Sequence, residues 1–373
     1  MPIEIESPEQ LGYDTMTNNL SESSVADRRL SDLDLGLDID DLLLCYGDHL
    51  GHPGLREQIV ADAHGVGPDD VIAMPGASAA LYCVSTSQLG PGDHAVILRT
   101  NYATNIETPR AIGADIDFLD LDFADGWALD LDRLATLIRP ETKLVSLTYP
   151  HNPTGAVLRV DELEAVIDLI DRSNAVLLLD ETYRDLTHDQ ALPMAASMSE
   201  RAVSVASLSK AYGLPGLRLG WLVCRDPARR ETLLAAKEQI FICGATLDEA
   251  IGAAVLADRD RLLSPIREQA REHRDIVARW IAAEPLIEWV APAGGVVCFP
   301  RVRHEVAFDG DEFYRCLLAE HGTYVGPGHW FEADDRHMRI GYGWPTTDEL
   351  RAGLAGVSAA LHHTLQAVGP DGR

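Results

Sequence analysis

Between residues 71 and 180, short apolar runs alternate with segments whose apolar residues recur at helical spacing, and this alternation limits the fold more than any other feature. The helix-like segments include Ser78–Leu89 and Val160–Asp171. Regular alternation of strand and helix predicts an α/β fold, in which a mostly parallel sheet is sandwiched by helices. The strands that we expect are Val71–Met74, Ala95–Leu98, Ile116–Leu119, Leu144–Leu147 and Val176–Leu179.

The remainder of the chain predicts two more strands of the large domain and then a smaller α+β domain. The elements that we expect are strands at Val203–Ser207, Leu219–Cys224, Val296–Pro300 and Met338–Tyr342, and helices at Arg229–Gln239, Glu268–Ala283 and from Thr347. A chain of 373 residues exceeds one simple core. We therefore expect an N-terminal arm at 1–45 that joins the small domain, a large domain at 46–265 and a small C-terminal domain at 266–373.

Charge and composition exclude several classes of partner and site. The formal charge is −28, with only three lysines, so the surface would repel the phosphates of nucleic acids and of anionic membranes. No apolar run reaches the ~20 residues of a membrane helix, and the N-terminus lacks a secretory signal. The six cysteines are scattered, and no metal-binding motif is present. We expect a cytoplasmic protein with reduced thiols and no metal.

The lysines are few enough to consider one by one. Lys237 falls in an expected helix and would ordinarily be solvated, and Lys143 opens a strand, where an edge charge is common. Lys210 instead follows a strand and the hydroxyl-rich turn Ser207-Leu208-Ser209, at the sheet edge where open α/β folds bind ligands. A partly desolvated amine there can form a Schiff base with an aldehyde. By itself, this pattern also fits a surface lysine on a loop.

Three polar residues near other strand ends strengthen the case for Lys210. Asp180 ends an apolar strand, and a carboxylate there would keep a pyridine nitrogen protonated, which makes pyridoxal phosphate an electron sink. Tyr183 and Asn152 could bond the phenolic oxygen of such a ring. Asn152 lies in Asn-Pro-Thr-Gly, which taken alone is more often a structural turn.

Other residues meet the needs of a phosphate and a flat ring. Gly76-Ala77-Ser78 joins a strand to a helix and offers backbone N–H groups to an anion. Ser207 and Arg218 flank Lys210, and Arg218 could make a two-pronged contact with phosphate. Tyr102 could stack on a ring, or be a packing tyrosine.

Taken together, these pieces resemble fold-type I pyridoxal-phosphate enzymes, in the class I/II aminotransferase family related to aspartate aminotransferase. The resemblance runs from about Asn18 to the final helix. The matching pieces are Tyr46–Arg56, Gly76–Ser78, Asn152–Gly155, Asp180–Tyr183, Ser207–Lys210, Gly216–Gly220 and Met338–Gly341.

The resemblance implies a role for each matching residue. Lys210 would hold the cofactor and move a proton at the substrate Cα, with Asp180 at the ring nitrogen and Tyr183 at the phenolic oxygen as the other catalytic groups. Arg339 and Asn152 would bind the substrate. Tyr46 would reach the cofactor of a second subunit, which implies a homodimer with shared active sites. The residues implied to contact pyridoxal 5′-phosphate are Tyr46, Gly76, Ala77, Ser78, Tyr102, Asn152, Asp180, Tyr183, Ser207, Lys210 and Arg218.

Two departures bear on the reaction. Arg99-Thr100-Asn101 lacks the proline often found before the stacking tyrosine, and the arm Asn18–Val25 is similar to that of the capreomycidine synthase-like subgroup. We expect an aminotransferase that moves an amino group between an L-amino acid and a 2-oxo acid. The alternative is β-elimination, replacement or cyclisation on a modified amino acid, for example an arginine-derived one. A DNA-binding regulator is disfavoured, because the acidic segment before Tyr46 has no helix-turn-helix pattern.

The substrate side chain is the least determined part of this interpretation. The arm, Tyr13 and the loop Gly328–Phe331 would build its pocket. Glu22 could pair with a cationic side chain, or make ordinary local contacts.

Overall fold

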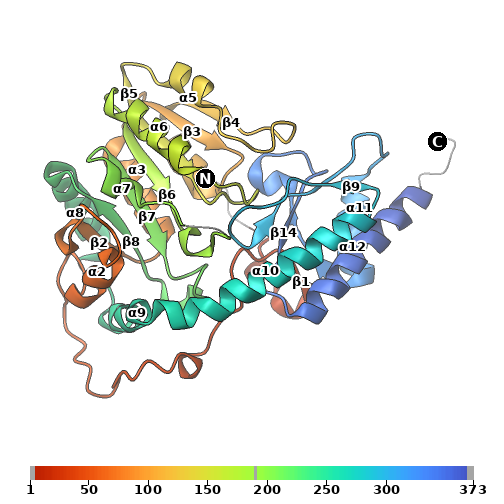
Figure 1. Cartoon of the computed structure of the whole chain (residues 1–373), viewed down its shortest axis with the longest axis horizontal. Coiled ribbons are helices and arrows are strands. Elements are labelled where there is room, and N and C mark those ends of the chain that lie inside the picture. Colours follow the sequence, from red (N-terminus) through yellow and green to blue (C-terminus); the bar gives the residue numbers. More distant parts are fainter. Residues whose placement is uncertain (1–4, 189–190, 368–373) are drawn as a thin grey trace.

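A seven-stranded sheet forms the centre of the larger part of the molecule (Figure 1). The computed structural model describes residues 5–188 and 191–367. The strand order is β2-β8-β7-β6-β5-β3-β4, and β8 is antiparallel to both of its neighbours while β3 to β7 are parallel. The strands are β2 (Val71–Met74), β3 (His94–Arg99), β4 (Asp115–Asp120), β5 (Thr142–Thr148), β6 (Val176–Asp180), β7 (Ala202–Ser207) and β8 (Gly220–Cys224). The predicted α/β fold and all seven strands are confirmed, each within two residues.

Helices cover both faces of this sheet because successive strand residues point to opposite sides. In β3, Ala95 and Ile97 pack into one apolar core, and Val96 and Leu98 pack into another. The first core includes residues of α3 and α8, and the second includes residues of α5 and α6. The helices are α1 (Pro8–Leu11), α2 (Pro53–Val60), α3 (Ala77–Gln88), α4 (Ala103–Ile112), α5 (Leu131–Leu137), α6 (Val160–Asp171), α7 (Ala195–Met198), α8 (Pro227–Phe241), α9 (Thr246–Ala257), α10 (Arg259–Ala283), α11 (Gly310–His321) and α12 (Thr347–Ala367).

The C-terminal part combines α10, α11 and α12 with short strands. These are β9 (Ile287–Glu288), β10 (Val297–Cys298), β11 (Arg301–Val302), β12 (Thr323–Tyr324), β13 (Gly326–Pro327) and β14 (Met338–Gly341). The predicted strand Val296–Pro300 is shorter than expected, since Pro300 has no N–H to donate to a neighbouring strand. The arm reaches this part through β1 (Asn18–Asn19), which pairs in parallel with β12.

Helix α10 connects the two parts as one continuous element (Figure 1). It contacts α9 beside the large sheet and α12 in the C-terminal part. The predicted domain boundary at 265/266 falls inside this helix, at Pro265. The predicted bounds of the arm and of the two domains remain predictions.

The prediction of a solvated Lys237 is wrong. Its side chain is fully buried in α8, whereas Lys143 is exposed as expected. The cause is the segment 45–52, which packs across α8 and α9 and accepts the Lys237 ammonium at the His49 carbonyl. Helical periodicity could not reveal this cover, because it comes from a loop almost 190 residues away.

The described residues contain no helix that could span a membrane and one small group of potential metal ligands. Within residues 5–188 and 191–367, no helix is both long and apolar enough to cross a membrane. One group of potential metal ligands occurs in the same ranges, on α11, where ligand atoms of Cys316, Glu320 and His321 all lie within 4.8 Å of one another.

Candidate active site

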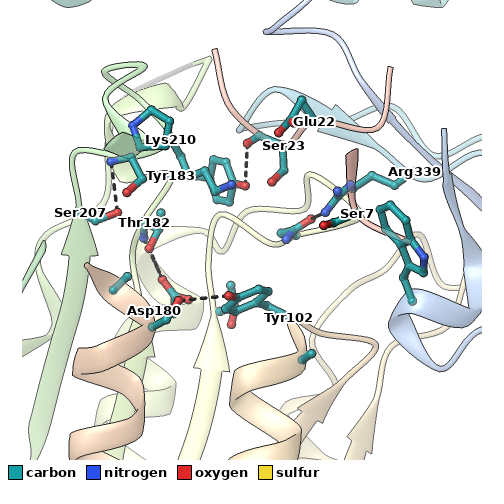
Figure 2. Close-up of a pocket in the computed structure, with 18 of the residues that line it drawn as sticks. Ser7, Glu22, Ser23, Tyr102, Asp180, Thr182, Tyr183, Ser207, Lys210 and Arg339 are labelled. Atoms are coloured by element: carbon teal, nitrogen blue, oxygen red, sulfur yellow. Dashed lines mark hydrogen bonds between the residues drawn. The ribbon is translucent and has the colours of Figure 1, made fainter. Parts of the chain in front are cut away.

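A cavity of about 430 Å³ opens at the carboxyl ends of β5, β6 and β7 (Figure 2). The last residues of these neighbouring strands, Thr148, Asp180 and Ser207, all line it. Eleven of the thirteen predicted site residues line this cavity, namely Glu22, Ala77, Ser78, Tyr102, Asn152, Asp180, Tyr183, Ser207, Lys210, Arg218 and Arg339. The other two, Gly76 and Tyr46, do not.

Lys210 follows β7 by three residues and is partly buried at the cavity. Burial lowers the pKa of the Lys210 ammonium, and the carboxylates of Glu22 and Glu9 oppose this effect. A depressed pKa increases the share of neutral amine, which is the form that attacks an aldehyde and accepts a proton. The chemistry of this position is therefore nucleophilic and basic.

Asp180 is the last residue of β6 and is 5% exposed. Its Oδ1 accepts hydrogen bonds from the Thr182 backbone N–H at 3.0 Å and from the Thr182 hydroxyl at 2.6 Å. Burial raises the pKa of Asp180, while the Thr182 bonds and the Lys210 charge favour the carboxylate. A cationic N–H placed beside this carboxylate would complete its pairing.

One end of the cavity is suited to an anion. Helix α3 begins after Gly76, which has φ 88° and no side-chain cap, so its first N–H groups face the cavity mouth. A Cβ at Gly76 would lie 2.7 Å from Nη2 of Arg218, so glycine allows the guanidinium to approach the turn. Arg218 itself has φ 47°. The Ser78 and Tyr102 hydroxyls are 3.0 Å apart at the same end.

The opposite end holds Arg339, from β14, with 9% of its surface exposed. Nη1 donates to Oδ1 of Asn152 at 3.2 Å, and Nη2 donates to the Ser21 carbonyl. Its guanidinium carbon lies 5.0 Å from the ring centroid of Phe331 and 5.7 Å from that of Trp330. A buried, oriented guanidinium of this kind is suited to a carboxylate.

The arm forms the wall between these two ends (Figure 2). Tyr183 donates its hydroxyl to the Ser23 carbonyl at 2.7 Å, which ties the arm to the sheet side of the cavity. Glu22 accepts a hydrogen bond from the Tyr13 hydroxyl at 2.9 Å. Burial raises the pKa of Glu22, and the charges of Lys210 and Arg339, which line the same cavity, lower it.

Comparison with protein families identifies the chain. The model of aminotransferase class I and II matches residues 15–357. The chain belongs to this family. It is 36% identical to capreomycidine synthase from Streptomyces vinaceus, over 87% of this chain and 82% of that protein. It is 30% identical to the arginine–pyruvate transaminase AruH of Pseudomonas aeruginosa, over 79% of this chain and 77% of that protein.

Solved structures of aminotransferases and of a cyclase share the fold. A PLP-dependent aminotransferase from Streptococcus suis superposes with a TM-score of 0.88 at 28% identity, over 95% of each chain. The PLP-dependent cyclase OrfR superposes with a TM-score of 0.87 at 29% identity, over 98% of this chain and 99% of that one. The family therefore implies pyridoxal phosphate as the cofactor and amino acids as substrates.

The residues of the cavity fit this cofactor. The Gly76 turn lets the Arg218 guanidinium approach the start of α3, because a Cβ there would clash with it, and a cation beside a helix N-terminus suits a phosphate. The amine of Lys210 and the carboxylate of Asp180 meet the needs of an aldehyde and a ring nitrogen.

Sequence reasoning missed one wall of the cavity. Ser7, Pro8, Glu9 and Gln10, around α1, line it next to Glu22. The Ser-Pro-Glu run is a helix-start signal that could have revealed α1. Nothing in the local sequence places this short helix at the cavity. It is fixed by Glu6, whose carboxylate accepts hydrogen bonds from the side chains of His329 and Trp330, more than 320 residues away.

His151 supports the turn that carries Asn152. Its ring nitrogens contact the Thr154 hydroxyl and the Thr100 carbonyl, each at 2.7 Å. Burial lowers the pKa of His151 to about 4, so the ring is neutral near pH 7. Its role is to hold the turn in place.

Tyr46 lies away from the cavity of its own chain and is 81% exposed. Leu43 and Leu44, just before it, are each 76% exposed. The main chain beside it contacts the start of α9, where the Thr246 hydroxyl donates to the Cys45 carbonyl at 2.8 Å.

Proposed function

We propose that this chain is an aminotransferase that moves an amino group between an L-amino acid and a 2-oxo acid. The observation that carries the proposal is that Lys210, Asp180 and Arg339 line one cavity, which brings an amine, a carboxylate and a guanidinium together. When bound, pyridoxal phosphate supplies an electron-withdrawing ring that accepts the electron pair of the broken Cα–H bond.

The chain's own residues would divide the work as follows. Arg339 clamps the substrate carboxylate, and this contact fixes which bond at Cα faces Lys210. Nζ of Lys210 would anchor the cofactor. Once released, the same amine would take the proton from the substrate Cα and deliver that proton again from the same face of the substrate. Its lowered pKa favours the neutral amine that this step requires.

The remaining residues hold the cofactor. Asp180 would keep the ring nitrogen protonated, and Tyr102 would stack on the ring. Asn152 would donate to the phenolic oxygen, and Tyr183 would do so by giving up its bond to the Ser23 carbonyl. Ala77, Ser78, Ser207 and Arg218 hold the phosphate, and Gly76 gives the turn its shape. These assignments rest on the shared cavity and on the motifs that the family has in common.

The comparisons favour a second candidate, which is β-elimination or cyclisation on an arginine-derived amino acid. Both capreomycidine synthase and the cyclase OrfR match the chain over most of its length. Removal of the Cα proton by Lys210 is common to both candidates, since a β-substituent can leave once that proton is gone. The candidates differ in where the amino group ends.

Glu22 is proposed to select a substrate with a cationic side chain. It lies in the arm, and its carboxylate faces the cavity beside Glu9, which also lines the wall. The cavity is therefore lined by two carboxylates as well as by the Arg339 guanidinium. An amino acid such as arginine carries complementary charges.

We also propose a homodimer with shared active sites. A second copy would cover an exposed apolar surface on the segment before α2 and at the end of α8. This surface comprises Leu43, Leu44, Tyr46, Ile240, Phe241 and Ile242. Because Tyr46 lies outside the cavity of its own chain, any contact with a cofactor must be made in the second copy. Light scattering at micromolar concentration tests the stoichiometry, and a monomer would refute the proposal.

The reaction is tested by absorption spectroscopy of the protein loaded with pyridoxal phosphate, while amino acids are added one at a time. An aminotransferase converts the bound cofactor to its amine form, and a 2-oxo acid restores the original absorption. In the second candidate the amine form does not accumulate, and mass spectrometry finds a product that has lost its β-substituent. A chain that never acquires the cofactor absorption would refute both.

A further inference from the structure

Lys237 is a fully buried lysine that the proposed reaction does not use. It lies in α8, and its ammonium donates to the main-chain carbonyl of His49. Burial lowers the pKa of Lys237, and the nearby carboxylate of Glu249 opposes this effect. A buried ammonium is costly unless other groups compensate its charge. Its position therefore calls for a role that an apolar residue could not fill.

Glu249, in α9, is the matching buried anion, with 4% of its surface exposed. Its Oε2 accepts the backbone N–H of His52 at 2.7 Å. Lys237 thus binds a carbonyl and Glu249 binds an N–H three residues later in the same segment. Each charge meets the main-chain group of opposite polarity, so the pair fixes the position and direction of residues 49–52.

Further contacts fix the same segment around Tyr46. The Thr246 hydroxyl donates to the Cys45 carbonyl at 2.8 Å, and the ring of His49 contacts the carboxylate of Glu238. The main chain is therefore anchored to α8 and α9 on both sides of Tyr46. The Tyr46 side chain itself is 81% exposed. A side chain on an anchored main chain loses less entropy when a partner binds it.

We propose that Lys237 and Glu249 are positioning residues for the active site of the neighbouring subunit, because they hold the segment that presents Tyr46. This inference rests on the proposed homodimer with shared sites. Buried charges rarely stabilise a fold more than apolar packing does, and their best-attested use is to select one arrangement of the chain. Loss of the pair should therefore weaken cofactor binding in the other subunit more than in its own.

Hybrid dimers separate the two effects. Subunits with different affinity tags are co-expressed, and one carries K210A, so that every working site uses Lys210 of the other subunit. K237M is placed either in the K210A subunit or in the subunit with the working Lys210. The dissociation constant of pyridoxal phosphate at the working site is measured by absorption, together with kcat/KM.

With K237M in the K210A subunit, we expect the dissociation constant to rise about tenfold, the usual scale for loss of a supporting contact. In the other placement we expect a change of less than about twofold. Y46F in the K210A subunit should reproduce the effect, and combining it with K237M should add little, because both changes act through one contact. If K237M raises the dissociation constant equally in the two placements, Lys237 has only a structural role and the inference is overturned.

Three controls keep the outcome interpretable. K237M/E249Q removes both buried charges while retaining shape, so it tests the inference if K237M alone fails to fold. K143M replaces the exposed lysine of β5 and should have no effect in either placement. If Y46F has no effect in the K210A subunit, the shared-site proposal itself fails. If Y46F acts and both Lys237 variants do not, only the positioning role of the pair is refuted.

Discussion

The two ends of the cavity are built in different ways. The proposed cofactor end consists of residues at the ends of adjacent parallel strands, such as Asp180 and Ser207, together with the start of α3. The substrate end joins the arm to β14, and its central contact, from Arg339 to the Ser21 carbonyl, spans 318 residues of sequence. The first end is held by the hydrogen bonds of a seven-stranded sheet, and the second by short strand pairings and a few backbone bonds of the arm, together with individual side chains.

This difference suggests a division of labour. Groups fixed to a rigid sheet are suited to chemistry that tolerates little displacement. A wall made of an arm and a loop can change its side chains without disturbing the sheet. We therefore expect substitutions at the cofactor end to reduce the reaction with every substrate, and those at the substrate end to act selectively.

The largest effect is expected for K210A. Loss of the anchoring and proton-carrying amine should lower kcat by about 10⁴-fold with every amino acid, because no other lysine lines the cavity. Single-turnover kinetics measure this, with K143M as the matched lysine control. Activity within tenfold of the wild-type enzyme would show that another group moves the proton.

D180N is expected to lower kcat by about 10³-fold, since an amide cannot stabilise a protonated ring nitrogen as a carboxylate does. The loss should be alike for all substrates. Stopped-flow absorption checks both points, and circular dichroism checks the fold. A loss confined to one substrate would contradict the division between the two ends.

R339K should lower kcat/KM by about 100-fold, mainly through KM, because an ammonium cannot reproduce the two-pronged contact with a carboxylate. Amino acids should suffer from this change, whereas simple amines that lack the carboxylate should be unaffected. Equal losses for both classes would place Arg339 outside the carboxylate site.

E22Q should change the preference between substrates by about tenfold while leaving the reaction with neutral amino acids nearly intact. The sharpest pair of substrates is arginine and citrulline, which have similar shapes but differ in side-chain charge. Their ratio of kcat/KM should fall in the variant. An unchanged ratio would remove Glu22 as the selecting residue.

The smallest effect is a pH shift that links the two ends. Burial lowers the pKa of Lys210 and Glu22 opposes this, so the neutral amine should exist at lower pH than for an ordinary lysine. The rate at which cofactor-free protein captures pyridoxal phosphate should rise with pH through that depressed pKa. In E22Q the midpoint should move to still lower pH. A midpoint at the pKa of an exposed lysine would contradict this environment.

Sequence patterns predicted the sheet and the residues that line the cavity at its strand ends, because both depend on local signals. Apolar runs mark the strands, and Asp180 and Lys210 follow directly from their ends. Patterns could not show that α1 lies at the cavity or that Lys237 is buried. Each of these features depends on contacts with a segment that is distant in the sequence. Patterns also did not reveal the hydrogen bond from the Tyr183 hydroxyl to the Ser23 carbonyl, because this bond depends on how the arm folds.

If Arg339 binds the substrate carboxylate as proposed, its contact with Ser21 would make substrate binding an exchange of partners. The guanidinium already donates to the Ser21 carbonyl and to Asn152 before any carboxylate arrives. A substrate must therefore offer more than these neutral acceptors do, which a charged carboxylate can. When the carboxylate replaces the Ser21 carbonyl, the arm loses an attachment next to Glu22. Recognition of the α-carboxylate and adjustment of the side-chain wall then become a single event.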